Sequence, residues 1–480
     1  MAGTDDYLRV ADAVAADIAA GRLRPGDRLA TQRAFARTHG IANSTAHRVY
    51  RELARRGLTV GEVGRGTFVR AAQHAPGPAL AEPAAPDAGT RVNLELNYPV
   101  VPEQAALLAE GMAPLLRPDA LDAALRPLGP AGHPAARAAA AALLTRTGFT
   151  PDPDRILFAG NGRHAVAGAV AALVPPGGRL GVEAHTYPLV KSIAARIGVT
   201  LVPLAMDAHG LRPEAVRAAH RSAPLHAVYL QPTLHNPLGV TMPAPRRVEL
   251  SDTLRELDLW AVEDAIWSFL DEDPVPAAPG SSAAGPVPPQ AGPAAPPPLA
   301  ALAPERTVLV DSLSKRLAPG LTVGLVLPPA ARRDAVASAL RSGGWTATGF
   351  ALEAATRWLA DGTVDRIVRA KRRDAAERQA LVRRHLDGFA VSADPRSYFA
   401  WWELPEGWRA ESFLAAAARR GIAVTPGTAF AVAPEGTQGT APAPHAVRLA
   451  LAGAPPDLLP YALTTLAAVA RGTPEDAFPE

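Results

Sequence analysis

The chain has 480 residues, a formal net charge of +3 and no cysteine, and its length predicts two or three domains. The lack of cysteine excludes disulfides, thiolate catalysis and cysteine metal ligands, and we predict no metal site. The acidic, polar start at Met1–Asp6 predicts no signal peptide, and no apolar run is long enough to span a membrane, so we expect a cytoplasmic protein.

The first part of the chain, residues 1–72, is basic. It holds twelve arginines against seven acidic residues, whereas the whole chain is nearly neutral. A compact basic segment on a near-neutral remainder indicates a nucleic-acid-binding module joined to a domain with another task.

The same segment predicts three helices and a hairpin. Apolar residues recur at helical spacing from Tyr7 to Ala20, and further helices are expected from Thr31 to Thr38 and from Asn43 to Arg56. Short strands at 59–60 and 67–69 are joined through a glycine-rich tip. Three helices followed by a β-hairpin predict a winged helix-turn-helix.

Three motifs in this segment resemble the GntR family of bacterial transcription regulators. They are G-x-L-x-P-G-D-x-L-x-T-Q-R from Gly21, T-x4-Y-x2-L-x3-G-L from Thr45, and G-x-G-T-F-V from Gly64. The resemblance implies contacts with double-stranded operator DNA from Arg33, Ser44, Thr45, His47, Arg65 and Gly66. Arg33 would bind phosphate, the three residues of the third helix would face the major groove, and the last two would form the wing tip.

The rest of the chain divides into a linker and a large domain. Residues 73–90 are rich in Ala and Pro and predict a semi-rigid linker. Residues 91–480 alternate strand-like and helix-like segments, which predicts an α/β domain with a mainly parallel sheet. The expected strands are Ile156–Ala159, Leu180–Glu183, Ala227–Gln231, Leu259–Glu263, Thr307–Val310 and Gly324–Leu327. Residues 273–304 carry eleven prolines and are expected to form a disordered insertion.

Lys315 stands just after the expected strand Thr307–Val310, where open α/β sheets place their ligands. Of the 49 Lys and Arg residues only three are lysines, at positions 191, 315 and 371. A desolvated lysine amine can form a Schiff base, whereas a guanidinium cannot, so a reactive lysine is one reading. A plain surface lysine is the other.

The strand ends together resemble the fold-type I aminotransferases, and a GntR head joined to such a domain is the MocR subgroup of regulators. That subgroup's large domain binds pyridoxal 5′-phosphate (PLP). The resemblance implies a cofactor site made of Lys315, Asp264, Asn236, Tyr187, Gly162, Arg163, Ser312 and Ser314.

By the same resemblance, Lys315 would hold PLP, Asp264 would pair with the ring nitrogen and Asn236 would bond the ring oxygen. Tyr187 would stack on the ring, and the turn at 161–165 would bind the phosphate. Arg448 would clamp an amino-acid carboxylate.

Three positions depart from the family pattern. Thr322 stands where a phosphate-binding arginine is expected, Ile266 where a tyrosine is expected, and Pro127-Leu128 where a further tyrosine is expected. Arg163, or Arg316, would supply the missing positive charge.

We therefore expect a homodimeric, DNA-binding transcription regulator that senses PLP or an amine or amino-acid effector, with at most residual transaminase activity. Two alternatives remain at this point. One is a PLP-dependent aminotransferase with an incidental DNA-binding head, and the other is a regulator whose large domain is only a dimerisation scaffold.

Overall fold

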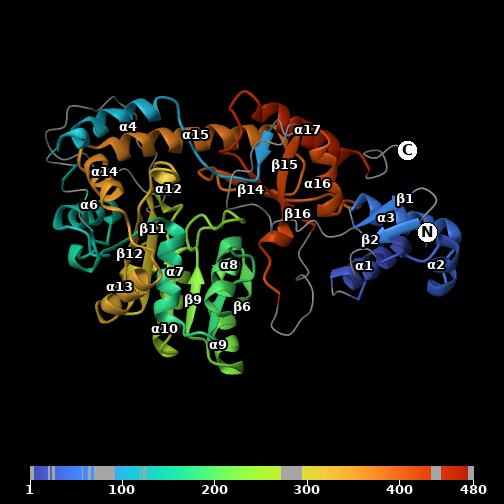
Figure 1. Cartoon of the computed structure of the whole chain (residues 1–480), viewed down its shortest axis with the longest axis horizontal. Helices are drawn as coiled ribbons and strands as arrows, with labels where there is room; N and C mark the ends of the chain where they lie inside the picture. Colours follow the sequence, from blue (N-terminus) through green and yellow to red (C-terminus); the bar gives the residue numbers. More distant parts are fainter. Residues whose placement is uncertain are drawn as a thin grey trace.

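The structure is a computed structural model that describes residues 5–19, 22–23, 27–56, 58–62, 66–69, 92–118, 121–122, 125, 127–271, 295–433 and 445–473. The expected linker at 73–90 and the wing-tip residue Arg65 lie outside the described residues. Figure 1 shows the N-terminal head in blue at one end of the molecule, beside the C-terminal elements in red. No helix in the described part of the chain is long and apolar enough to cross a membrane.

The head contains the three helices and the hairpin that its sequence predicts. The helices are α1 (Asp5–Ala19), α2 (Gln32–His39) and α3 (Asn43–Arg55). Strands β1 (Thr59–Glu62) and β2 (Gly66–Val69) pair antiparallel. The expected winged helix-turn-helix is therefore confirmed.

Local signals explain where these helices begin and end. The hydroxyl of Thr31 accepts a hydrogen bond from the N–H of Ala34 at 3.4 Å and caps α2. Gly40, with φ of 64°, ends that helix in the left-handed conformation that glycine adopts without strain. At the start of α3 the cap is Ala42, which makes no side-chain hydrogen bond. The apolar residues predicted on one face of α1 pack against Phe35 of α2 and Leu53 of α3.

The large domain is built on a sheet of seven strands in the order β4-β12-β11-β10-β9-β5-β6. Their bounds are β4 (Leu157–Ala159), β5 (Arg179–Glu183), β6 (Thr200–Leu204), β9 (Ala227–Leu230), β10 (Trp260–Asp264), β11 (Thr307–Ser312) and β12 (Gly324–Leu327). Strand β12 runs antiparallel to both its neighbours, and every other pairing is parallel. The predicted mainly parallel sheet is confirmed, with β6 as an additional edge strand.

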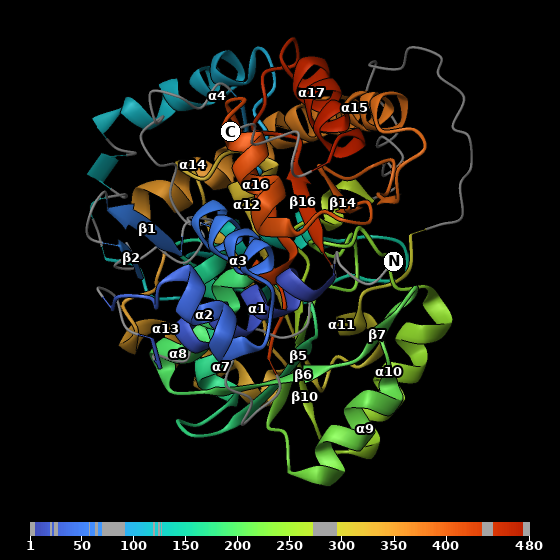
Figure 2. The same cartoon turned by 90° about the vertical axis from the view of Figure 1, so that its right-hand side faces the viewer.

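Helices cover both faces of this sheet, as a parallel sheet requires. Along β11, Val308 and Val310 pack on one face with α7 and α13, and Leu309 packs on the other face with α14 and α15. The helices of this layer structure are α4 (Gln104–Met112), α6 (Pro134–Leu144), α7 (Gly162–Leu173), α8 (Pro188–Ile197), α9 (Pro213–Ser222), α10 (Ala244–Glu256), α13 (Arg333–Ser342), α14 (Gly349–Ala360) and α15 (Thr363–His385). Figure 2 shows α9 and α10 together at one edge of the domain.

A second sheet, which the sequence analysis did not separate, lies toward the C-terminus. Its strands are β13 (Val391–Ser392), β14 (Phe399–Glu403), β16 (Ala446–Ala450), β15 (Ile422–Pro426) and β3 (Val92–Leu94), in that order. Helices α16 (Ala410–Ala418) and α17 (Leu459–Arg471) contribute to its core. Because β3 comes from the start of the large domain, it carries the residues after it to the boundary between the two sheets. A small hairpin, β7 (Met206–Asp207) with β8 (Gly210–Leu211), lies apart from both sheets.

The expected insertion at 273–304 is wrong at its C-terminal end. Residues 272–294 lie outside the described residues, but Leu299–Leu302 form the short helix α11, in which Leu299 is fully buried. The backbone N–H groups of Leu299 and Ala300 donate to the buried carboxylate of Glu263 at 3.1 and 2.9 Å. Because the prolines dominate this stretch of sequence, the short apolar helix was not predicted. Burial in the core and these two hydrogen bonds hold it in place.

Candidate functional site

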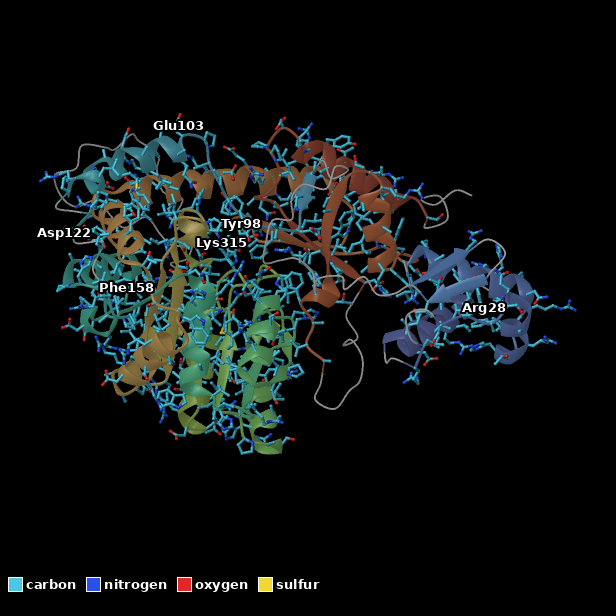
Figure 3. The ribbon with its side chains drawn as sticks, viewed as in Figure 1. Arg28, Tyr98, Glu103, Asp122, Phe158 and Lys315 are labelled. Atoms are coloured by element: carbon cyan, nitrogen blue, oxygen red, sulfur yellow. The ribbon has the colours of Figure 1, made fainter. Side chains whose placement is uncertain are left out.

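One cavity of about 360 Å³ lies at the carboxyl ends of β9, β10 and β11. Seven of the eight predicted cofactor-site residues line it, namely Lys315, Asp264, Asn236, Tyr187, Gly162, Arg163 and Ser314, and the predicted carboxylate clamp Arg448 also lines it. Ser312 is the exception, because its buried side chain lies behind the cavity wall. Figure 3 shows Lys315 and Tyr98 close together at this end of the large sheet.

Lys315 projects from α12 (Leu313–Arg316), a short helix that directly follows β11. Its Nζ donates to the carbonyl oxygen of Asn97 and lies 4.4 Å from the centre of the Tyr98 ring. Burial and, to a lesser extent, the charges of Arg163, Arg448 and Lys371 lower the pKa of Lys315 to about 7. Near neutral pH a large share of this amine is therefore unprotonated, which is the nucleophilic form.

Asp264 ends β10 and is buried in the cavity wall. Its Oδ2 accepts hydrogen bonds from the Tyr229 hydroxyl at 2.6 Å and from Gln231 Nε2 at 3.0 Å. Its Oδ1 accepts from the N–H of Ile266 at 3.1 Å. Burial raises the pKa of Asp264 while these donors oppose the rise, so a cation in the cavity would favour the carboxylate.

Asn236 is held beside Asp264 through Gln231. The N–H of Asn236 donates to Gln231 Oε1 at 3.1 Å, and the N–H of Gln231 donates to the Glu183 carboxylate at 2.9 Å. Among the described residues, the buried side-chain oxygen of Asn236 has no hydrogen-bond partner. The Asn236 amide therefore borders the cavity with unused hydrogen-bonding capacity.

The N-terminus of α7 forms another wall. Asn161 caps the helix, with its Oδ1 accepting from the N–H of His164 at 2.9 Å. The next residue, Gly162, packs tightly against Ser312, because a Cβ added to Gly162 would lie 3.1 Å from Ser312 Cβ. Arg163 follows in the first turn and hydrogen-bonds the Tyr187 side chain, whose pKa burial raises to about 12. A helix N-terminus with an adjacent arginine is suited to an anion such as a phosphate group.

The substituted positions also have defined places. Thr322 lines the cavity, and its hydroxyl lies 2.9 Å from the Ser312 hydroxyl, so the two share a hydrogen bond. Ile266 lines the cavity as an apolar group. Arg316 is buried in an ion pair with Asp311 at 2.8 Å and does not line the cavity, so Arg163 is the better placed replacement cation.

Arg448 reaches the cavity from β16 of the second sheet. Its Nη2 donates to the carbonyl oxygen of Glu95 at 2.7 Å and to the Thr425 hydroxyl at 3.3 Å. Burial lowers the pKa of Arg448 to about 10, and burial raises the pKa of the Glu95 carboxyl. Within the described chain its buried Nε has no hydrogen-bond partner, so this guanidinium has a donor left for a further anionic group.

Four of the six predicted DNA-contacting residues lie on α2 and α3 of the head. Arg33, Ser44 and His47 are exposed and Thr45 is half-buried. His47 Nδ1 lies 3.2 Å from the Gln32 side-chain oxygen, so the two helices meet at this surface. Gly66 begins β2, next to the undescribed wing tip. Two arginines near the end of α3, Arg55 and Arg56, instead pair with the buried Glu52.

The sequence did not predict Gln231, Asn97 and Tyr98, which line the cavity, or Tyr229, which supports Asp264 from behind the cavity wall. Gln231 is the last residue of the expected strand 227–231, and this strand-end position is a signal that could have predicted it as a site residue. Tyr229 lies inside a buried strand and gave no such signal. Asn97 and Tyr98 follow β3 without any motif, and only the tertiary fold brings them to Lys315.

Comparison with known proteins agrees with both halves of the molecule. A family model described as "Aminotransferase class I and II" matches residues 116–466, and one described as "Bacterial regulatory proteins, gntR family" matches residues 6–69. Among solved structures, LysN, an alpha-aminoadipate aminotransferase from Thermus thermophilus, is 21% identical with a TM-score of 0.67, covering 80% of this chain and 93% of that one. This likeness shows a shared fold.

Several relatives among curated sequences are named as transcriptional regulators. YdeF of Bacillus subtilis, which is named an uncharacterized HTH-type transcriptional regulator, is 28% identical over 89% of this chain and 87% of its own length. The pyridoxine biosynthesis transcriptional regulator PdxR of Corynebacterium glutamicum is 24% identical over 76% of this chain and 75% of its own. TauR of Rhodobacter capsulatus is 26% identical over 67% of each.

The protein is thus a DNA-binding transcription regulator with an aminotransferase-like domain. The chain belongs to the aminotransferase class I and II family, and its GntR-type head gives it the MocR arrangement.

Proposed function

We propose that the protein is a PLP-dependent regulator that binds operator DNA through its head and senses PLP, or an amine or amino acid that reacts with PLP. One observation carries the proposal. Lys315, Asp264, Asn236 and Arg163 border a single cavity in a chain that also has a GntR-type head.

The residues of the cavity fit PLP. Asp264 offers a buried carboxylate for a ring nitrogen, and Asn236 offers unsatisfied hydrogen-bonding capacity for a ring oxygen. The α7 N-terminus and Arg163 suit the phosphate group. When bound, PLP supplies an electron-poor ring and an aldehyde carbon that reacts with primary amines. The Lys315 amine, with its low pKa, is the group of this chain that would bind that carbon.

The site favours sensing over rapid turnover. Arg448 is available to orient a carboxylate, so an amino-acid effector can be placed beside Lys315. Thr322 and Ile266, however, remove a cation and a hydroxyl that the family pattern expects. We expect turnover far below the usual enzyme range of about 1–1000 per second.

The regulatory output would come from a coupled equilibrium. An effector that binds one conformation of the large domain more tightly shifts the population toward it, and the head follows. We propose a homodimer, since two heads can read two half-sites of an operator. The aminotransferase alternative predicts a turnover of about 1–1000 per second and an operator affinity that no ligand changes.

Replacing Lys315 tests the proposal. The wild type should purify with, or take up, PLP and show the visible absorbance of a lysine-bound cofactor, and Lys315→Met should lose that absorbance while remaining folded. Amino acids should shift both the absorbance and the operator affinity of the wild type but not of the variant. Lys191→Met serves as the matched control, because Lys191 does not line the cavity. Wild-type protein that takes up no PLP would overturn the proposal.

A further inference from the structure

The third lysine of the chain, Lys371, lies directly behind the reactive one. It belongs to α15, its side chain is 0% exposed, and its Nζ donates to the carbonyl oxygen of Lys315 at 2.9 Å and to the carbonyl oxygen of Leu317. We propose that Lys371 is a positioning residue that holds the Lys315 turn against α15 and places a second cation beside the reactive amine.

The backbone around Lys315 needs such a partner. Helix α12 has four residues, and the last carbonyl groups of a helix have no partner within it. Lys371 satisfies two of these carbonyls, and Gln104 of α4 donates a further hydrogen bond to Leu317 O at 3.1 Å. The turn is thereby anchored to α15 and α4, while the Lys315 side chain points into the cavity and donates to the carbonyl oxygen of Asn97.

Lys371 is itself held in place. Its own carbonyl oxygen accepts a hydrogen bond from the Tyr398 hydroxyl at 2.7 Å, and Tyr398 is completely buried. Tyr398 precedes β14 of the second sheet, so this contact ties α15 to that sheet at the level of the cavity. The position of Lys315 therefore depends on a chain of contacts that runs through Lys371.

The charge of Lys371 acts on Lys315 as well. It is one of the three cations that, after burial, lower the pKa of Lys315. Burial also lowers the pKa of Lys371 itself to about 7, and Asp374, one turn further along α15, opposes that change. Two amines that share this environment favour states in which only one is protonated.

An arginine would serve poorly at this position, although the chain is rich in arginine. A lysine ammonium is compact and can point at two neighbouring carbonyl oxygens, whereas a guanidinium is a larger planar fork. The retention of lysine here fits the fully buried space between α12 and α15.

Competitive labelling of the full chain tests the inference. Because there are three lysines, trace acetic anhydride with mass spectrometry reports each amine separately across pH. Lys371→Met should raise the labelling pKa of Lys315; a rise of about one unit lowers its unprotonated fraction at pH 7 about five-fold. Lys191→Met is the matched control, since Lys191 also donates to two carbonyls, those of Ala429 and Ala431, but not to the Lys315 turn.

Lys371→Arg separates position from charge. It should keep the low labelling pKa of Lys315 but weaken PLP binding, measured by titration of the visible absorbance. If Lys371→Met does not fold, the Lys371→Arg variant alone tests the positioning role. An affinity of Lys371→Arg for PLP equal to that of the wild type would overturn this role. An Lys315 labelling curve in folded Lys371→Met that matches the wild type would overturn the role of the charge. The inference rests on the proposed reactivity of Lys315, but anhydride labelling does not use PLP, so the two can fail separately.

Discussion

Gly324, at the start of β12, packs closely against the residue that caps α7. A Cβ at this residue would lie 2.3 Å from the carbonyl oxygen of Asn161, the residue that caps α7. The obstacle is backbone and cannot rotate away. The tight packing of this strand against the α7 N-terminus therefore requires glycine, and the shape of the proposed phosphate site depends on it.

Gly324→Ala should consequently destabilise the protein and weaken PLP binding together. Overpacking of this kind costs about 1–3 kcal/mol, and the displaced α7 N-terminus would no longer offer its N–H groups in place. Thermal unfolding and PLP titration measure the two effects. Gly320→Ala is the matched control, because a Cβ there meets no atom within 4 Å. Equal melting temperatures and PLP affinities for both variants would contradict this account.

At the residue scale, sequence reasoning found the side chains that follow strands and missed those that support them. Lys315 and Asp264 come directly at or after a strand end, so the topology of a parallel sheet brings them together. Tyr229 and Gln231 support Asp264 from the neighbouring strand. That relation depends on strand order and register, which the linear sequence does not state.

Helix α11 shows how an element can be concealed by its composition. Prolines precede it, yet Leu299 is completely buried and the helix N–H groups bind the Glu263 carboxylate in the core. Removing the helix would leave that buried carboxylate without these two donors, which is costly in free energy.

We therefore expect Leu299→Ala to destabilise the protein by about 2–5 kcal/mol, the usual range for a buried leucine. Val248→Ala on the neighbouring helix α10 is the matched control, since Val248 is exposed and should change stability by less than about 0.5 kcal/mol. Denaturant unfolding measures both. Replacing residues 273–304 with a short Gly/Ser link should also lower stability, and an unchanged unfolding midpoint would show that α11 contributes nothing.

At the element scale, all six strands predicted from the sequence are present in the structure. They could be predicted because β-branched runs bounded by turn residues are a strong local signal. The second sheet was not predicted as a separate unit. Its edge strand β3 comes from the beginning of the large domain, and it pairs with β15 more than three hundred residues later. Such a pairing leaves no local trace in the sequence.

The two halves of the molecule meet at a charged contact. Asp12 on α1 accepts from Arg56 Nη1 at 2.9 Å within the head and from Arg409 Nη2 at 2.5 Å in the large domain. Arg409 caps α16, which packs on β15, and β15 pairs with β16 so that Thr425 lies opposite Arg448. Figure 1 shows α16 facing the head. A continuous set of elements thus links Arg448, the proposed carboxylate-binding residue, to Arg56 at the C-terminal end of α3.

The charge difference and the motifs predict two halves, but nothing in the sequence indicates how these halves lie relative to one another. The sequence pattern predicts only that Asp12 is a polar residue on the solvent-facing side of an amphipathic helix. Its bridging role depends on a residue almost four hundred positions away, and only the folded chain brings Arg409 to it.

Because Asp12 is about two-fifths exposed, the bridge is screened by solvent and should be worth about 0.2–1 kcal/mol. Asp12→Asn should accordingly reduce, by at most about five-fold, the change in operator affinity that a ligand of the large domain produces, and raised salt should erase the difference. Asp17→Asn is the matched control, since Asp17 has similar exposure and pairs with Arg22 inside the head. Operator titrations with and without ligand, at low and high salt, measure the coupling. If Asp12→Asn and Asp17→Asn respond to ligand as the wild type does, the bridge carries no signal between the halves.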